Sequence, residues 1–323
     1  MVYDAIVVGG GINGLCTLYH LLRLGCRSVT LIEQFKLGHQ QGSSHGTSRI
    51  TRSSYSSPTY VQLMQQVHNE EWPRLETDSK MKLLHPTPGC FWGPEDGTVR
   101  QYAKAVIEMG SDVAHLSPSE ARIRFPMIRF SDRDTILNDS TCALVAADNT
   151  IKSLIRICVE QKAKLLEEES VIDIDFDSDP VQVKTSDRTL WTKKLAITAG
   201  SWVSRLIPSV NRRLTVTLQT VGYFELVGRH TEFFFHGSLV DPGRSTARRP
   251  AKLIENGRQH NLGIIEAAWL APSITALSCS DYALAHPIVE HVVGNACLLA
   301  EFDAGKKVRS FSHANTNRSK YYL

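Results

Sequence analysis

Apolar and polar positions divide the beginning of the chain into a strand, a turn, a helix and a second strand. Ala5–Val8 is a short β-branched apolar run, which predicts a buried parallel strand. Apolar residues then recur at helical spacing from Ile12 to Leu24, and a second apolar run covers Val29–Ile32. This order predicts a strand–helix–strand unit of the kind that builds open parallel sheets.

Glycines fill the junction between the first strand and the helix. Gly9, Gly11 and Gly14 have the G-x-G-x-x-G spacing, in which the glycines allow a tight turn, close approach of a pyrophosphate, and close packing of helix on strand. The helix N-terminus offers N–H groups to the phosphates. Glu33 ends the second strand 24 positions after Gly9, where the acid that binds ribose hydroxyls is expected and where it disfavours a 2′-phosphate. We therefore predict a dinucleotide site; the alternative is a glycine-rich turn without a ligand.

Composition limits the kind of protein. At 323 residues and 42% apolar content, the chain is long enough for a sizeable core and about two domains. A net charge of +3, dispersed along the chain, indicates no nucleic-acid partner and no membrane surface. Seven cysteines without a C-x-x-C favour free thiols in a reducing compartment. The first strand leaves no room for a secretory signal, and no run of about 18 uncharged apolar residues is present, so we expect an intracellular protein.

The region from Phe35 to Pro58 breaks both periodicities and predicts a long loop. Its stretch GSSHGTSRITRSSY places His45, Arg49 and Arg52 among small hydroxyl residues. Long loops inside compact domains are usually functional or disordered. From the residues alone, the two arginines could equally lie on a solvated face, and His45 could be a structural hydrogen-bonding histidine.

Later segments predict further elements. Apolar residues return at helical spacing from Tyr60 to Leu75, and LLHPTPGCFWGPEDG indicates a strand and turns near a domain boundary. Ser117 and Glu120 have capping-box spacing before a short helix that ends ahead of Pro126.

The segment after residue 145 predicts a helix and three strands. Asn149 is expected to cap a helix that runs to about Lys162. The strands are expected at Ser170–Phe176, Val181–Thr185 and Lys194–Thr198. The last strand enters AITAGSW, and a parallel return beside the first strand would place Gly200 near the same cofactor, although an ordinary strand-ending glycine has the same spacing.

Four motifs in this order, AIVVGGGINGL, GSSHGTSRITR, RFPMI and LAITAGSWVSRL, resemble the monomeric sarcosine oxidase and pipecolate oxidase group of FAD-dependent amine oxidases, in the D-amino-acid-oxidase-like superfamily. The second motif is the specific one. The resemblance covers about two thirds of the chain, Tyr3 to Val227. It implies an α/β fold with a Rossmann-like FAD-binding domain (1–82 and 146–206) and an α+β substrate domain carrying an antiparallel sheet (83–145 and 207–228), incomplete here and followed by a divergent tail (229–323).

The resemblance also implies site residues. Arg49 matches an arginine against the flavin ring, Arg52 the arginine that pairs with the substrate carboxylate, and His45 a histidine beside the flavin. Val171 matches the position whose backbone meets the adenine. No metal is expected. The implied FAD-binding residues are Gly9, Gly10, Gly11, Ile12, Gly14, Glu33, Gln34, Ser43, Ser44, Arg49, Val171 and Gly200.

The implied reaction suits these residue types. Oxidation of a secondary amino acid of the sarcosine or pipecolate type leaves negative charge on the reduced flavin, which a fixed cation such as Arg49 would stabilise. The planar fork of Arg52 matches a carboxylate. The products would be an imine and, after reoxidation by oxygen, hydrogen peroxide. The implied partners are a small amino acid and oxygen, and the implied state is a monomer.

The resemblance stops after LQTVGYFELVG, residues 218–228. The tail has no recognisable oxygen-activating lysine, flavin-linking cysteine or G-F-S-G-H-G-F-K-like return strand; Cys279 is a weak match for the cysteine, and Lys252, Lys306 and Lys307 match no part of the family pattern. We therefore expect non-covalent FAD and poor oxidase activity. The family resemblance implies a peroxisomal protein, whereas the ending SKYYL is not the S-K-L address and predicts a cytosolic form.

Two other hypotheses stay open. One is a non-catalytic isoform or fragment that retains only a dinucleotide-binding domain. The other is an NAD-linked dehydrogenase, which the 42–52 segment disfavours.

Overall fold

The structure is a computed structural model that describes residues 1–87, 89–126, 128–214 and 216, together with five short strands further along the chain. Of those strands, β13 pairs antiparallel with β15, and β14 pairs parallel with β16. Their bounds are β13 Phe224–Glu225, β14 His236–Ser238, β15 Lys252–Leu253, β16 Glu266–Ala268 and β17 Leu298–Ala300.

The large sheet has the strand order β10-β11-β12-β1-β2-β9, and β17 pairs antiparallel with β12. The strands β9, β2, β1 and β12 are parallel, whereas β11 and β10 continue the sheet as an antiparallel ribbon. Their bounds are β1 Val2–Val8, β2 Val29–Ile32, β9 Lys164–Leu166, β10 Val171–Asp175, β11 Val181–Thr185 and β12 Thr189–Ile197. Because β1 and β12 run in the same direction, the turns that follow them meet at one edge of the sheet.

Alternate residues of β1 point to two different cores. Ala5 and Val7 pack with helices α1 (Ile12–Arg23) and α6 (Ala147–Glu160). Ile6 and Val8 pack on the opposite face with Val203 and Val210. Those two residues belong to α7 (Val203–Leu206) and to the 3₁₀ helix η3 (Pro208–Arg213), which follow η2 (Gly200–Trp202). A sheet buried on both faces accounts for the nearly continuous apolar run of β1.

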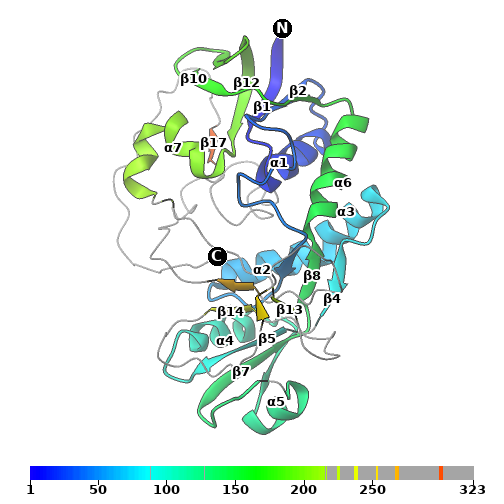
Figure 1. Cartoon of the computed structure of the whole chain (residues 1–323), viewed down its shortest axis with the longest axis vertical. Helices are drawn as coiled ribbons and strands as arrows, with labels where there is room; N and C mark the ends of the chain where they lie inside the picture. Colours follow the sequence, from blue (N-terminus) through cyan, green and yellow to red (C-terminus); the bar gives the residue numbers. More distant parts are fainter. Residues whose placement is uncertain are drawn as a thin grey trace.

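Two smaller antiparallel sheets lie further along the long axis, with β4 and β8 near its middle and β5 and β7 towards the end opposite the large sheet (Figure 1). One has the order β5-β7-β6 and the other β3-β8-β4. The bounds are β3 Ser48–Thr51, β4 Leu84–Pro86, β5 Gly89–Pro94, β6 Val113–Leu116, β7 Asp134–Asp139 and β8 Ala143–Ala146. The helices of this part are α2 Pro58–Gln66, the π-helix η1 Val67–Glu71, α3 Trp72–Ser79, α4 Val99–Glu108 and α5 Pro118–Arg124.

These elements confirm the α/β fold with a parallel sheet and additional antiparallel sheets. The second strand has the bounds that its pattern predicts, and Ser117 and Glu120 form a complete capping box at α5. The three strands expected after residue 169 are present as β10, β11 and β12, the last of which begins earlier, at Thr189. The domain boundaries stay predictions.

Two expectations about local structure are wrong. Asn149 does not cap α6: Ala146 occupies the cap position, and the first helical N–H, that of Ala147, donates to the Thr47 carbonyl at 3.0 Å. The helix ends at Glu160. The 35–58 region is not all loop, because β3 pairs with β8, with Arg49 opposite Val145. In both places a distant segment supplies the partner that the local pattern lacks.

The described residues place further limits. No helix among them has the length and apolar content to span a membrane. The cysteines described there, Cys16, Cys26, Cys90, Cys142 and Cys158, are free thiols. Cys279, Lys306 and Lys307 lie outside the described residues, and for Lys252 only the backbone pairing of β15 is described.

Candidate cofactor and substrate site

The turn between β1 and α1 is closely packed around its glycines. Gly9 has φ of +104°, and a Cβ there would collide with the Thr198 carbonyl, so only glycine fits. A Cβ on Gly14 would collide with the Gly9 carbonyl and would lie 2.7 Å from Thr198 Oγ1. Gly11 differs, because the nearest atom to a Cβ there is Ser44 Oγ, at 3.0 Å. Gly9 and Gly14 therefore serve the packing of helix on strand, whereas Gly11 faces the Ser44 side chain.

Glu33 ties the end of β2 to this turn. Its side chain is buried, and Oε2 accepts from the Gly10 N–H at 2.6 Å while Oε1 accepts from the Phe35 N–H at 2.9 Å. His39 Nε2 lies 3.5 Å from Oε1. A carboxylate has about four acceptor positions, so Glu33 retains capacity for ribose hydroxyls. The adjacent Gln34 is half-buried.

The N-terminus of α1 carries donors suited to a phosphate. The Ile12 N–H donates to Ser44 Oγ at 3.0 Å, and the Gly11 N–H has no acceptor among the described residues. A helix N-terminus with a free N–H and a neighbouring hydroxyl favours an anion. Together with Glu33, these residues fit the pyrophosphate and ribose of a dinucleotide such as FAD.

The turn after β12 lies beside the glycine turn. Thr198 donates through its N–H to the Val8 carbonyl at 2.8 Å and through Oγ1 to the carbonyls of Val8 and Gly9, at 2.9 and 3.0 Å. Gly200 follows with φ of +51° and has open space where a Cβ would lie. The structure thus brings Gly200 to the same sheet edge as Gly9 through Thr198, a residue that we did not single out from the sequence although it lies within AITAGSW.

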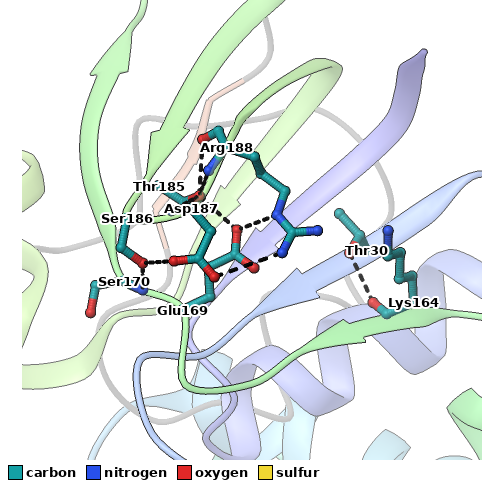
Figure 2. A network of polar contacts seen from close by, with 8 residues as sticks. All are labelled: Thr30, Lys164, Glu169, Ser170, Thr185, Ser186, Asp187 and Arg188. Carbon is teal, nitrogen blue, oxygen red and sulfur yellow. Dashed lines mark hydrogen bonds and ion pairs between the residues drawn. The ribbon is translucent and has the colours of Figure 1, made fainter.

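A buried carboxylate organises the segment that precedes Val171. Figure 2 shows Glu169 between Thr185 and Arg188: Oε1 accepts from Thr185 Oγ1 at 2.6 Å and from Arg188 Nε at 3.0 Å. The Glu169 N–H donates to the Glu33 carbonyl at 3.0 Å. Val171, half-buried, pairs with Thr185 at the start of β10. One short hydrogen-bonded segment therefore joins Val171, the implied adenine position, to Glu33, the implied ribose acid.

The Arg49 side chain stabilises the 42–49 segment through hydrogen bonds to three carbonyls of that segment. Arg49 donates from Nη1 to the Ser48 carbonyl at 2.7 Å, and from Nη2 to the carbonyls of Ser43 and His45 at 2.8 and 2.7 Å. His45 is exposed and donates from Nδ1 to the Gly42 carbonyl at 2.6 Å. Arg49 and His45 thus shape the loop that carries Ser44 to the helix N-terminus.

Arg52 is oriented differently. Its Nε donates to the Ser54 carbonyl at 3.2 Å, and its guanidinium carbon lies 5.2 Å from the Tyr55 ring centroid and 5.9 Å from that of Phe91. No described residue accepts from Nη1 or Nη2. The two aromatic rings and the Ser54 carbonyl set the direction of the guanidinium, and its terminal nitrogens retain the planar fork that binds a carboxylate.

A polar cluster that the sequence did not predict includes the chain neighbours of Arg52 on both sides. It consists of Thr51, Ser53, Ser54, His68, Asp139 and Thr141. His68 lies on the π-helix η1, with Nε2 2.7 Å from Thr51 Oγ1 and Nδ1 3.3 Å from Ser53 Oγ. Burial lowers the His68 pKa, which favours the neutral ring, and nearby Asp139 opposes this shift. No local motif joins residues this far apart in the chain.

Comparison with known proteins gives a family match over most of the chain. Residues 4–258 match the family described as FAD dependent oxidoreductase (DAO). The chain is 34% identical to the peroxisomal sarcosine oxidase of Mus musculus over 220 residues, which are 68% of this chain and 55% of that protein. It is 30% identical to the monomeric sarcosine oxidase of Streptomyces avermitilis over 225 residues, 69% of this chain and 58% of that protein. The chain thus spans about half the length of the curated relatives it matches.

Solved structures show the same fold. NikD, an unusual amino acid oxidase essential for nikkomycin biosynthesis, superposes in its open form with a TM-score of 0.57 at 21% identity, covering 69% of this chain and 57% of that chain. L-proline dehydrogenase from P. horikoshii superposes with a TM-score of 0.59 at 19% identity, covering 71% and 62%. Because the match covers residues 4–258, this chain belongs to the family of FAD-dependent oxidoreductases, and its matched relatives include sarcosine oxidases.

Proposed function

We propose that this chain is the FAD-binding and substrate-carboxylate-binding part of an oxidase that acts on a secondary amino acid of the sarcosine or pipecolate type. The observation that carries the proposal is the Arg52 guanidinium, whose direction is set by Ser54, Tyr55 and Phe91 while Nη1 and Nη2 have no acceptor in the described part of the chain. A cation with an open planar fork is suited to the carboxylate of an amino acid.

The other residues have supporting roles in this proposal. The Gly9–Gly14 turn and the α1 N-terminus would hold the pyrophosphate, and Glu33 the ribose. Bound flavin would supply the two-electron oxidation of the amine. Arg49 keeps the 42–49 segment folded through three carbonyls, so it would fix a positive charge on that loop without needing a new conformation.

We also propose that turnover by this chain is slow and that its FAD is non-covalent. Residues 229–323 contain no recognisable flavin-linking cysteine or return strand. An oxidase needs a water-excluded site around the reacting ring. The names of the monomeric relatives support a monomer, which light scattering of the purified chain would test.

The test is to purify the chain and record its absorbance spectrum, then add sarcosine and pipecolate in turn and follow hydrogen peroxide. We expect oxidised-flavin bands, little peroxide, and flavin that leaves the protein on acid precipitation. A folded but colourless protein would contradict the cofactor assignment. Robust peroxide formation, or flavin that stays with the pellet, would contradict the slow-turnover proposal. Flavin without a response to any carboxylate would favour the non-catalytic alternative.

A further inference from the structure

We propose that Asp139, which lies at the end of β7, is a positioning residue for Arg52: it holds the turn after β3 so that the guanidinium presents its terminal nitrogens to a substrate carboxylate. This inference rests on the proposed function and adds a residue that lies 87 positions away from Arg52 in the sequence.

Asp139 accepts five hydrogen bonds from two neighbouring turns. Its Oδ2 accepts from the N–H groups of Ser53 and Ser54, at 2.9 and 2.8 Å, and from Ser54 Oγ at 2.7 Å. Its Oδ1 accepts from the N–H and the Oγ1 of Thr141, at 2.9 and 2.6 Å. One carboxylate therefore fixes the two peptide groups that directly follow Arg52 and joins them to the turn between β7 and β8.

Ser54 links the Asp139 carboxylate to the Arg52 guanidinium. Its N–H and Oγ both donate to Asp139, and its carbonyl, in the next peptide group, accepts from Arg52 Nε. Because the backbone and the side chain of Ser54 are both anchored, the freedom of its carbonyl is restricted, and with it the direction in which Arg52 Nε donates. Tyr55, the next residue, contributes an aromatic face to the same guanidinium. Loss of the Asp139 bonds would release the carbonyl and the ring together.

Asp139 holds the turn next to Arg52 without forming a described ion pair with it. Asp139 is buried, at 1% exposure, and in the described part of the chain no Lys, Arg or His nitrogen lies within ion-pair distance of its carboxylate. The pKa of the Cys142 thiol is raised to about 12, mainly by burial and also by the Asp139 charge, whereas Arg52 opposes the rise, so Cys142 interacts electrostatically with both side chains. Because Asp139 is satisfied by neutral donors, the Arg52 fork remains open to an incoming carboxylate.

A purely structural role would have a different signature. Removal of a buried hydrogen-bonded carboxylate destabilises most folds, so stability alone does not test the proposal. A residue that acts through Arg52 must lose its effect on carboxylate binding when Arg52 is already removed, since interacting sites are non-additive.

The experiment uses the full chain loaded with FAD, and acetate as the probe, followed through the flavin absorbance spectrum. We expect Asp139→Asn to weaken acetate binding about 10-fold or more, because the oriented fork is lost. Flavin content is expected to stay within about two-fold of the parent, since the hydrogen bonds described for Asp139 come from Ser53, Ser54 and Thr141 and not from the nucleotide turn. In an Arg52→Met background, Asp139→Asn is expected to change acetate affinity by less than about two-fold.

Two further variants keep the test decisive. Ser54→Ala removes only the hydroxyl donor, leaves both backbone donors, and is expected to weaken acetate binding about three-fold; it replaces Asp139→Asn if that variant does not fold. Glu71→Gln is the matched control, since Glu71 is also buried and its ion-pair partners are Arg23, at 2.8 Å, and His20, at 3.9 Å, neither of which belongs to the polar cluster next to Arg52. It is expected to leave acetate affinity unchanged.

The outcomes separate the two proposals. Parent-like acetate affinity in Asp139→Asn, or in Ser54→Ala where that variant replaces it, would overturn the positioning role and leave the proposed function intact. An equal loss in the Arg52→Met background, or in Glu71→Gln, would show a general structural effect and also overturn it. A parent chain that binds FAD but not acetate would overturn both.

Discussion

The glycine turn after β1 and the turn after β3 keep their shapes by different means. The glycine turn keeps its shape through close backbone packing. Gly9 lies against the Thr198 carbonyl, and Gly14 lies against the Gly9 carbonyl and Thr198 Oγ1, so a side chain fits at neither position. The turn after β3 keeps its shape through a side chain: Asp139, which lies on a strand of another sheet, accepts hydrogen bonds from the Ser53 and Ser54 N–H groups. The glycine turn therefore depends on the absence of side chains, whereas the turn after β3 depends on a carboxylate from a distant part of the chain.

This difference separates the expected effects of substitution. Substitutions in the backbone turn should produce steric collisions and act on the fold or on the nucleotide. Those in the side-chain turn should act on orientation, with the cofactor retained. The predictions below test that separation from the largest expected effect to the smallest.

Gly14→Val should give the largest effect. Its Cβ would collide with the Gly9 carbonyl and crowd Thr198 Oγ1, and both atoms belong to the sheet edge, which has little freedom to move. We expect a loss of about 3 kcal/mol or more in the free energy of unfolding, with no flavin retained. Urea unfolding followed by circular dichroism measures this. Gly42→Val is the control, because a Cβ there would make only ordinary contacts, with His39 Cε1 at 3.5 Å and Trp202 Cζ3 at 4.0 Å; a parent-like stability of Gly14→Val would contradict the packing role.

Gly11→Val should remove the cofactor without unfolding the chain. The nearest atom to a new Cβ is Ser44 Oγ at 3.0 Å, a side-chain atom that can move, whereas a bound pyrophosphate would lose its approach to the backbone. We expect flavin affinity to fall about 100-fold or more, with helix content unchanged. Flavin absorbance per mole of folded protein checks this, and equal flavin content in variant and parent would remove the turn from the cofactor site.

Arg52→Lys should leave flavin content unchanged and weaken the binding of a carboxylate substrate. Lysine keeps the charge but lacks the planar fork. We expect the Michaelis constant, or the dissociation constant for acetate where turnover is too slow, to rise about 10-fold. Steady-state kinetics or a flavin difference spectrum provides the measurement. An unchanged constant would exclude Arg52 from the substrate site.

Glu169→Gln should produce the smallest effect. Glutamine still accepts from Thr185 Oγ1, and the lost partner Arg188 is 43% exposed, so water screens that ion pair. We expect ADP affinity to fall by no more than about five-fold, measured by calorimetry. A 100-fold loss would show that side-chain contacts, and not only backbone, organise the nucleotide half.

The sequence by itself determined the strand, the glycine turn and the helix at the start of the chain. The apolar run of β1, the glycine spacing and Glu33 lie within one short segment, and each has a local physical meaning, so the fold of this segment and the contact of Glu33 with the turn follow from the pattern. The role of Glu33 as the ribose acid stays a prediction. The bounds of β2 and the capping box at Ser117 were predictable for the same reason, because these elements depend on neighbours in the chain.

Tertiary structure decided the rest. Asn149 has a side chain that could cap a helix, yet the first N–H of α6, that of Ala147, donates to the Thr47 carbonyl. Strand β3 forms because it pairs with β8. The directions of the two arginines followed the same rule. Arg49 turns onto three carbonyls of its own loop, whereas Arg52 is left open by a turn that Asp139 holds. Their spacing in the sequence is that of one motif, but hydrogen-bond partners from other elements set the direction of each side chain, and those partners meet only in the folded chain.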